Sequence, residues 1–204
     1  MQQDLLQLPG YRVSDYQLVL VPHEELRNRI IQTRKEFSEK YKTVFSRFSK
    51  PYLPLVYFTQ YEMMEERILN RLRTVGLGQY PFRVEFRDFG SFPSHSININ
   101  VPTKLPVQDL VKRVREETQR LMKFTDEHKP HFITEPYVNI ASKLKPWQYE
   151  KGWLEYSHLH FTGKFIADKM LLLKKRVGDQ GFRPVQVFDF ENMPVNTKQG
   201  ELFR

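Results

Sequence analysis

Two short segments of the 204-residue chain place a tyrosine between a proline and an apolar run. The first reads Pro51-Tyr52-Leu53-Pro54-Leu55, and the second reads Pro136-Tyr137-Val138-Asn139-Ile140. A phenol hydroxyl can donate a hydrogen bond to a phosphate, and its ring can stack on a nucleobase. The Asn139 amide can also donate, whereas Pro54 offers no side-chain donor. Both segments therefore carry groups suited to a phosphate-bearing ligand.

The two tyrosines are poorly suited to proton transfer. A tyrosine titrates near pH 10, so removing its proton at pH 7 costs about 4 kcal/mol unless the surroundings lower its pKa. A general acid or base contributes typically about 10²–10⁴-fold to a rate, and it works best with a pKa near the working pH. Tyr52 and Tyr137 therefore predict ligand binding without acid–base catalysis. The plainer alternative is that both rings pack in the core.

Lysines accompany both segments. Lys50 lies two residues before Tyr52, and Lys143 and Lys145 follow Tyr137 by six and eight residues. The formal net charge of +8 favours phosphate-bearing partners such as RNA or nucleotides. We expect the three lysines to make the cleft beside the tyrosines electropositive, although strand-end lysines are also common on ordinary solvated surfaces.

The other residues with chemical potential form weaker patterns. The chain has no cysteine, which excludes disulfides, thiolate metal sites and cysteine nucleophiles. His160-Phe161-Thr162 follows a predicted helix, and we expect His160 to lie far from both tyrosines. His158 and His160 lack carboxylate or cysteine partners at metal-ligand spacing, so no metal and no cofactor are expected. A relocated catalytic centre built on His160, Thr162 and His95 remains an alternative.

The apolar periodicity predicts the elements that position these residues. Alternating or short buried apolar runs are typical of strands, and apolar residues at helical spacing are typical of helices. We expect strands at 16–21, 53–58, 82–89, 96–101, 138–142, 165–174 and 185–190, and helices at 24–41, 64–75, 107–122 and 146–158.

The order strand, helix, strand, helix, strand occurs twice. Val21 and Val101 lie 80 positions apart, Tyr52 and Tyr137 lie 85 apart, and Phe82 and Phe165 lie 83 apart. Such agreement predicts one duplicated α+β domain over 1–204. Its two pseudo-symmetric lobes are expected at about 16–89 and 95–190, with a cleft between them and a C-terminal tail at 191–204.

The chain resembles the 2H phosphoesterase superfamily, the 2′-5′ RNA ligase-like proteins, from residue 16 to about 190. Residues 18–26, LVLVPHEEL, are similar to the family's first strand and helix start. The resemblance implies a two-lobed fold with antiparallel-rich sheets lining a central cleft and helices outside. Each lobe of the family carries a His-x-Thr or His-x-Ser motif. Here Tyr52 and Tyr137 stand at the histidine positions, and Pro54 and Asn139 at the hydroxyl positions.

The resemblance predicts a protein like the 2′-5′ RNA ligases and cyclic phosphodiesterases, but catalytically degenerate, binding RNA or nucleotide phosphate in a basic cleft. The expected binding residues are Tyr52, Tyr137, Asn139, Lys50, Lys143 and Lys145. Two alternatives are an active phosphoesterase or RNA-end enzyme with a relocated centre, and a protein-interaction module that keeps only the fold. The first ten residues lack the apolar core of a signal peptide, and no apolar run approaches about 20 residues. We therefore expect a cytoplasmic protein without a membrane partner.

Overall fold

The computed structural model describes residues 10–45, 50–93 and 95–193. Of the expected C-terminal tail, residues 194–204 lie outside this range. The described residues form nine strands and four α-helices. The strands are β1 (Val13–Leu20), β2 (Leu53–Tyr61), β3 (Phe82–Phe92), β4 (Ser96–Asn100), β5 (His131–Phe132), β6 (Tyr137–Ser142), β7 (Thr162–Ala167), β8 (Lys169–Arg176) and β9 (Arg183–Asp189). The helices are α2 (Glu24–Tyr41), α3 (Glu65–Leu77), α4 (Lys104–Met122) and α5 (Pro146–Tyr156), with a short 3₁₀ turn at Glu62–Met64 before α3.

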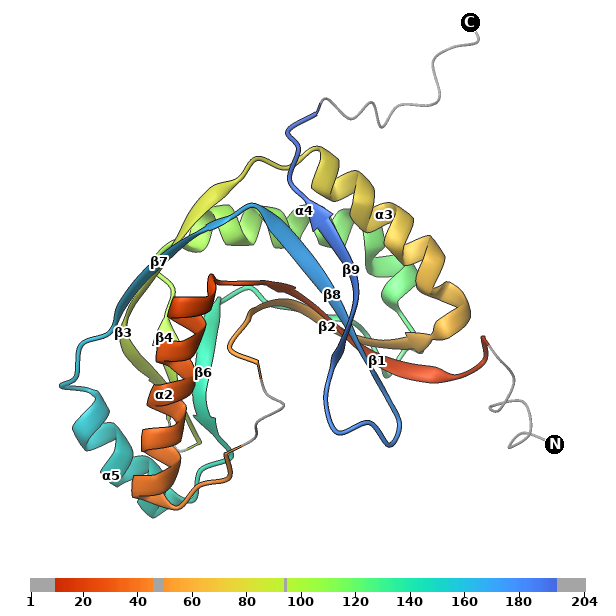
Figure 1. Ribbon diagram of the computed structural model, residues 1–204. Helices are drawn as coiled ribbons and strands as arrows, with labels where there is room; N and C mark the ends of the chain where they lie inside the picture. The colour runs from red at the N-terminus through yellow and green to blue at the C-terminus, as the bar shows by residue number, and fades with distance from the viewer. Residues whose placement is uncertain (1–9, 46–49, 94, 194–204) are drawn as a thin grey trace, which may run out of the picture.

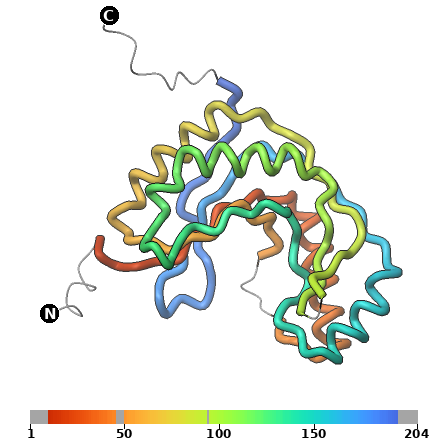
Figure 2. Tube along the Cα trace, turned by 180° about the vertical axis from the view of Figure 1, so that it is seen from behind, coloured from red at the N-terminus to blue at the C-terminus, as the bar shows by residue number. Residues whose placement is uncertain are grey.

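The strands form two antiparallel sheets that together curve into an arch (Figure 1). The first has the order β5-β2-β1-β8-β9, and the second has the order β6-β4-β3-β7. Helices α3 and α4 run side by side over the first sheet (Figure 2), whereas α2 and α5 cover the second. Within the described residues, no helix is both long enough and apolar enough to cross a membrane. The fold is thus α+β with its helices on the outer side, as predicted.

Each half of the chain gives its last strand to the sheet of the other half. β3 ends the first half but pairs with β4, and β8 ends the second half but pairs with β1. The orders β2-β1-β8 and β6-β4-β3 are therefore equivalent. Tyr52 directly precedes β2 and Tyr137 is the first residue of β6, so both tyrosines occupy the same place in the repeat.

The expected single strand at 165–174 is wrong, because the chain forms two strands there. β7 ends at Ala167 in the second sheet, and β8 begins at Lys169 in the first, so the chain changes sheets at Asp168. Both strands bury apolar side chains, and a continuous apolar run cannot reveal a change of partner. The two-residue strand β5 is not among the expected strands, and it pairs with Val56 and Tyr57 of β2.

A β-bulge interrupts β2 and β6 at equivalent positions. Leu18 lies opposite Val56 and Val19 opposite Pro54, which leaves Leu55 as the extra residue of β2. The pairing of β6 with β4 skips Ile140 in the same way. A bulge inserts one residue and so changes which side chains share a face. Tyr57 consequently lies on the same face as Tyr52 and Pro54. With regular alternation, Tyr57 would lie on the opposite face.

Candidate functional site

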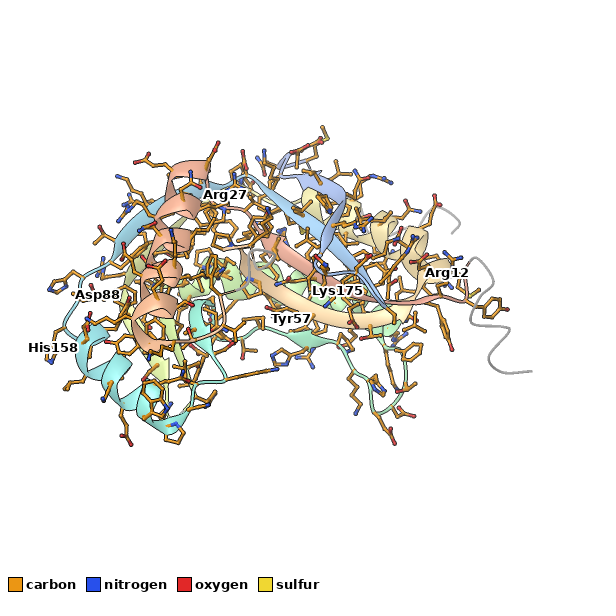
Figure 3. The ribbon with its side chains drawn as sticks, turned by 60° about the horizontal axis from the view of Figure 1, so that its bottom comes forward. Arg12, Arg27, Tyr57, Asp88, His158 and Lys175 are labelled. Atoms are coloured by element: carbon orange, nitrogen blue, oxygen red, sulfur yellow. The ribbon has the colours of Figure 1, made fainter. Side chains whose placement is uncertain are left out.

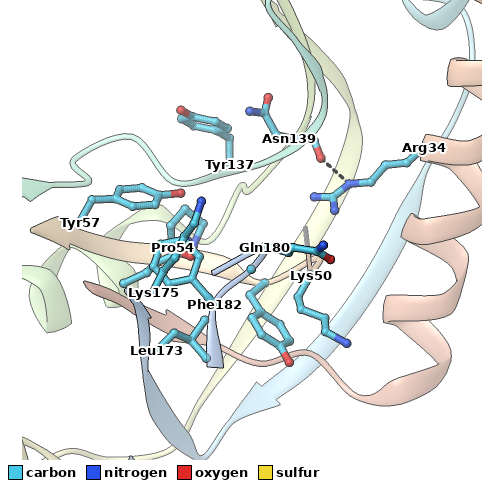
Figure 4. A pocket seen from close by; sticks show the side chains of 13 residues that line it. Arg34, Lys50, Pro54, Tyr57, Tyr137, Asn139, Leu173, Lys175, Gln180 and Phe182 are labelled. Atoms are coloured by element: carbon cyan, nitrogen blue, oxygen red, sulfur yellow. Dashed lines mark hydrogen bonds between the residues drawn. The ribbon is translucent and has the colours of Figure 1, made fainter. Parts of the chain in front are cut away.

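A pocket of about 310 Å³ opens between the two sheets, where β2 and β6 begin. Its lining comes from α2, β1, the segment before β2, β2 itself, β6, β8 and the β8–β9 connection (Figure 4). The described lining residues are Gln17, Arg34, Lys50, Tyr52, Pro54, Tyr57, Tyr137, Asn139, Leu173, Lys175, Gln180, Gly181 and Phe182.

All four motif positions line this pocket. Tyr52 and Pro54 come from β2 and the residue before it, and Tyr137 and Asn139 come from the first half of β6. The two tyrosines are half-buried, so neither ring is a fully packed core side chain. Lys50, also predicted, is exposed and belongs to the lining.

The other two predicted lysines lie elsewhere. Lys143 follows the last residue of β6, is exposed, and adopts a left-handed backbone conformation with φ of 56°. Lys145 is exposed at the start of α5, where its backbone N–H donates to Oε1 of Gln148 at 2.9 Å. Neither residue is among those that line the pocket. Lys143 thus offers a matched control for the lysines that do.

Arg34 supplies a buried positive charge to the pocket wall. Its side chain projects from α2, is 9% exposed, and donates from Nε to the Asn139 carbonyl oxygen at 2.8 Å (Figure 4). Burial lowers the pKa of Arg34 to about 10, which still leaves it charged at neutral pH. Sequence reasoning missed this residue. The signal was an arginine on the buried stripe of α2, between Ile30 and Phe37.

Tyr57 and Lys175 add a phenol and an ammonium group from the first sheet. They lie next to each other in Figure 3, and both side chains point toward the centre of the pocket in Figure 4. Burial, together with the nearby Tyr137 hydroxyl, raises the pKa of Tyr57 to about 12, although Arg34 acts in the opposite direction. Tyr57 therefore stays protonated at neutral pH and can donate a hydrogen bond. Neither residue carries a motif signal in the sequence.

The connection between β8 and β9 closes one side of the pocket. Asp179 holds this connection, because its carboxylate accepts from the Arg176 backbone N–H and from Nη2 of Arg183, each at 3.2 Å. Phe182 packs with Tyr52 on a small apolar cluster formed by Val19, Leu171 and Leu173. The pocket thus has an apolar patch around Leu173 and Phe182, and its cations come from three separate segments.

The charge of the pocket is positive. Arg34, Lys50 and Lys175 line it, and the described lining contains no aspartate, glutamate or histidine. The arrangement can bind an anion through cations and neutral donors. It lacks a described side chain that would exchange a proton near pH 7.

None of the six histidines is among the described residues that line the pocket. His160 contacts Oδ1 of Asp88 at 3.1 Å, and Figure 3 places Asp88 and the neighbouring His158 far from Tyr57 and Lys175. His95 stacks on Phe92, with ring centroids 6.1 Å apart. Across the residues described, no three histidine, cysteine, aspartate or glutamate side chains group as a metal site.

Comparisons with known proteins agree with this architecture. The family model of the 2′-5′ RNA ligase superfamily matches residues 22–179. No curated protein sequence matches the chain. The crystal structure of E. coli LigT complexed with 3′-AMP has a TM-score of 0.61 and 13% identity, covering 88% of this chain and 99% of LigT. The crystal structure of TT0787 of Thermus thermophilus has a TM-score of 0.59 and 14% identity, covering 87% of this chain and 98% of that one.

LigT complexed with ATP is also similar, with a TM-score of 0.54 and 14% identity over 87% of this chain and 98% of LigT. Identities this low establish the shared fold alone. The family match, in contrast, spans both segments that place a tyrosine at the pocket. The chain therefore belongs to the 2′-5′ RNA ligase superfamily, within the two-lobed 2H phosphoesterases that the sequence resembles.

Proposed function

We propose that this protein is a catalytically degenerate member of the superfamily that binds the phosphate of a nucleotide or an RNA end in the pocket. The observation that carries the proposal is the combination of Tyr52, Tyr137 and three cations in one open pocket whose described lining has no histidine. The site thus retains phosphate-binding groups while lacking side chains suited to proton transfer at neutral pH.

Two further observations support binding over the alternatives. LigT, which shares the fold, has been crystallised with 3′-AMP, phosphate, ATP and NADP⁺. The pocket is open and cationic. A protein-interaction module that kept only the fold would not require either property. The relocated centre finds no support in the pocket, because His160, Thr162 and His95 are all outside its described lining.

The activity test compares the natural protein with a variant that restores the motif residues: Tyr52→His, Pro54→Thr, Tyr137→His and Asn139→Thr. We expect no hydrolysis of 2′,3′-cyclic AMP by the natural protein above the rate without enzyme. Each general acid or base contributes about 10²–10⁴-fold to the rate of hydrolysis. A variant that regains both groups should therefore turn over at a readily measured rate. Steady hydrolysis by the natural protein at neutral pH would contradict the proposal.

The binding test uses calorimetric titration with 3′-AMP. We expect the natural protein to bind it and the Lys175→Gln variant to bind it at least about tenfold more weakly, because a charge-assisted hydrogen bond contributes roughly 1.5–3 kcal/mol. Lys143→Gln removes a lysine side chain outside the pocket, and this variant should bind like the natural protein. Equal affinities for all three proteins would place the binding elsewhere.

A further inference from the structure

The pocket has three cationic side chains, more positive charge than is required to neutralise a singly charged phosphate. Arg34 reaches it from α2, Lys50 from the segment before β2, and Lys175 from β8. A carboxylate on the same face of the first sheet, Asp15 of β1, lies across from Lys175. Its Oδ1 accepts a hydrogen bond from Oγ1 of Thr59 at 2.7 Å, and within the described residues no ion pair joins it to Lys175.

Neutral donors complete the lining. The hydroxyls of Tyr52, Tyr57 and Tyr137 belong to it, with the side-chain amides of Gln17, Asn139 and Gln180. Tyr57, like any tyrosine with a pKa of 10 or above, is protonated at neutral pH and can donate. A ligand oxygen therefore meets donors from both sheets, and no described lining carboxylate repels a second negative charge.

We infer that the pocket selects a terminal phosphate monoester over a cyclic phosphate or an internal phosphodiester. A monoester carries a charge of about −1.5 to −2 at pH 7 and three acceptor oxygens, whereas each of the diesters carries a single charge. The three cations stabilise the second negative charge of the monoester. Donors from β2 and β6 can bind its third acceptor oxygen. The inference rests on the proposed function and names the ligand class of that same pocket.

The experiment measures the affinity of the full-length protein for 3′-AMP and for 2′,3′-cyclic AMP between pH 5 and pH 8 at constant ionic strength. At pH 7.5 we expect 3′-AMP to bind at least about tenfold more tightly. Its affinity should rise with pH through about 6, where a phosphate monoester loses its second proton. The affinity for 2′,3′-cyclic AMP should stay flat, because the described lining has no histidine to titrate in this range.

Two variants assign the preference to the pocket. Lys175→Gln should narrow the ratio of the two affinities, whereas Lys143→Gln should leave it unchanged, and thermal unfolding of both variants checks that they fold. A ratio near one, a flat pH profile for 3′-AMP, or a ratio unaffected by Lys175→Gln overturns the inference. If 3′-AMP binds measurably in those cases, the proposed function survives. If neither nucleotide binds, the proposed function fails as well.

Discussion

The Glu62 carboxylate links the 3₁₀ turn to the neighbouring ends of β1 and β8 in the first sheet. Oε1 accepts from Oγ of Ser14 at 2.9 Å and from Nε of Arg176 at 2.6 Å, and Oε2 accepts from Nη2 of Arg176 at 3.0 Å. Nζ of Lys174 lies 3.7 Å from Oε1. The Arg176 hydrogen bond is the largest cause that lowers the pKa of Glu62, and burial opposes it. The Glu62 side chain is 13% exposed but that of Arg176 is 49% exposed, so solvent screens part of this interaction.

Replacing Glu62 by Gln should reduce stability in a pH-dependent way. The folded-state pKa lies below the ordinary value of 4.5, so the carboxylate stabilises the fold above that pH. This contribution disappears as the pH falls through the folded-state value. We expect Glu62→Gln to cost about 1 kcal/mol at pH 7 and to approach the natural protein as the pH falls well below 4. Urea unfolding at several pH values measures the difference.

The control is Glu39→Gln on the exposed face of α2. Glu39 pairs with Lys35 at 3.9 Å, and both side chains are largely exposed, so the change should cost less than about 0.5 kcal/mol. A Glu62→Gln effect that is the same at every pH would show that shape, and not charge, accounts for it.

At the same scale, the sequence could identify only some residues of the pocket. Tyr52, Pro54, Tyr137, Asn139 and Lys50 were predicted from the resemblance and from local spacing, and the pocket brings all five together. The cations that complete it depend on tertiary packing. A lysine such as Lys175 becomes a lining residue only through the pairing of β8 with β1, which its neighbours in the sequence do not encode.

At the scale of elements, α5 packs against α2 and β4 through the missing side chain of Gly152. A Cβ atom there would lie 2.8 Å from both Cε2 and Cζ of Phe37, and 3.2 Å from Cδ1 of Ile97. The Phe37 ring cannot easily give way, because it is 1% exposed and lies between Tyr41 and Tyr156, with ring centroids 4.6 and 5.1 Å away. Gly152, a poor helix former, is therefore the residue that permits this close contact.

Gly152→Ala should destabilise the protein, although alanine is intrinsically better in a helix by about 1 kcal/mol. Overpacking a tight core typically costs about 1–3 kcal/mol, so we expect a net loss of about 1 kcal/mol in thermal or urea unfolding. Lys151→Ala, at the exposed neighbouring position, should change stability by less than about 0.5 kcal/mol. A stabilised Gly152→Ala variant would mean that α5 can move away from α2 at little cost.

Helices and most strands were predictable because their apolar spacing is local. The predicted 24–41 helix coincides with α2. Two features escaped because they depend on the partner strand. The bulges at Leu55 and Ile140 exist only in the registers with β1 and β4, and the bulge at Leu55 decides whether Tyr57 faces the pocket. The break at Asp168 likewise depends on tertiary structure, because the apolar run around it is divided between β7 of the second sheet and β8 of the first.

At the scale of the whole molecule, the exchange of β3 and β8 makes the two halves interdependent. Each sheet obtains a central strand from the other half, so a cut between the halves would remove a paired strand from both sheets. The same exchange places β8, which carries Lys175, beside the strands of the first half. The pocket is consequently built from side chains that lie between 17 and 182 in the sequence.

The net charge of +8 extends beyond the pocket, and salt can separate the two contributions. A mononucleotide reaches only the pocket cations, whereas a single-stranded RNA of about ten nucleotides also covers neighbouring basic surface. Because each neutralised phosphate releases counterions, the logarithm of affinity falls with the logarithm of salt concentration by about 0.7 per contact for single strands. We therefore expect a steeper salt dependence for the RNA than for 3′-AMP.

Charge variants make this expectation specific. Lys175→Ala should weaken both ligands and flatten the RNA slope by about 0.7, since it removes one phosphate contact. Lys143→Ala should leave 3′-AMP binding unchanged at every salt concentration, because Lys143 lies outside the pocket, and should reduce the RNA slope only if the strand passes the end of β6. Fluorescence anisotropy of a labelled RNA, with 3′-AMP as competitor, measures both quantities in one titration. If Lys143→Ala weakens 3′-AMP as much as Lys175→Ala does, the nucleotide is held by diffuse surface charge, and the pocket has no special role in binding.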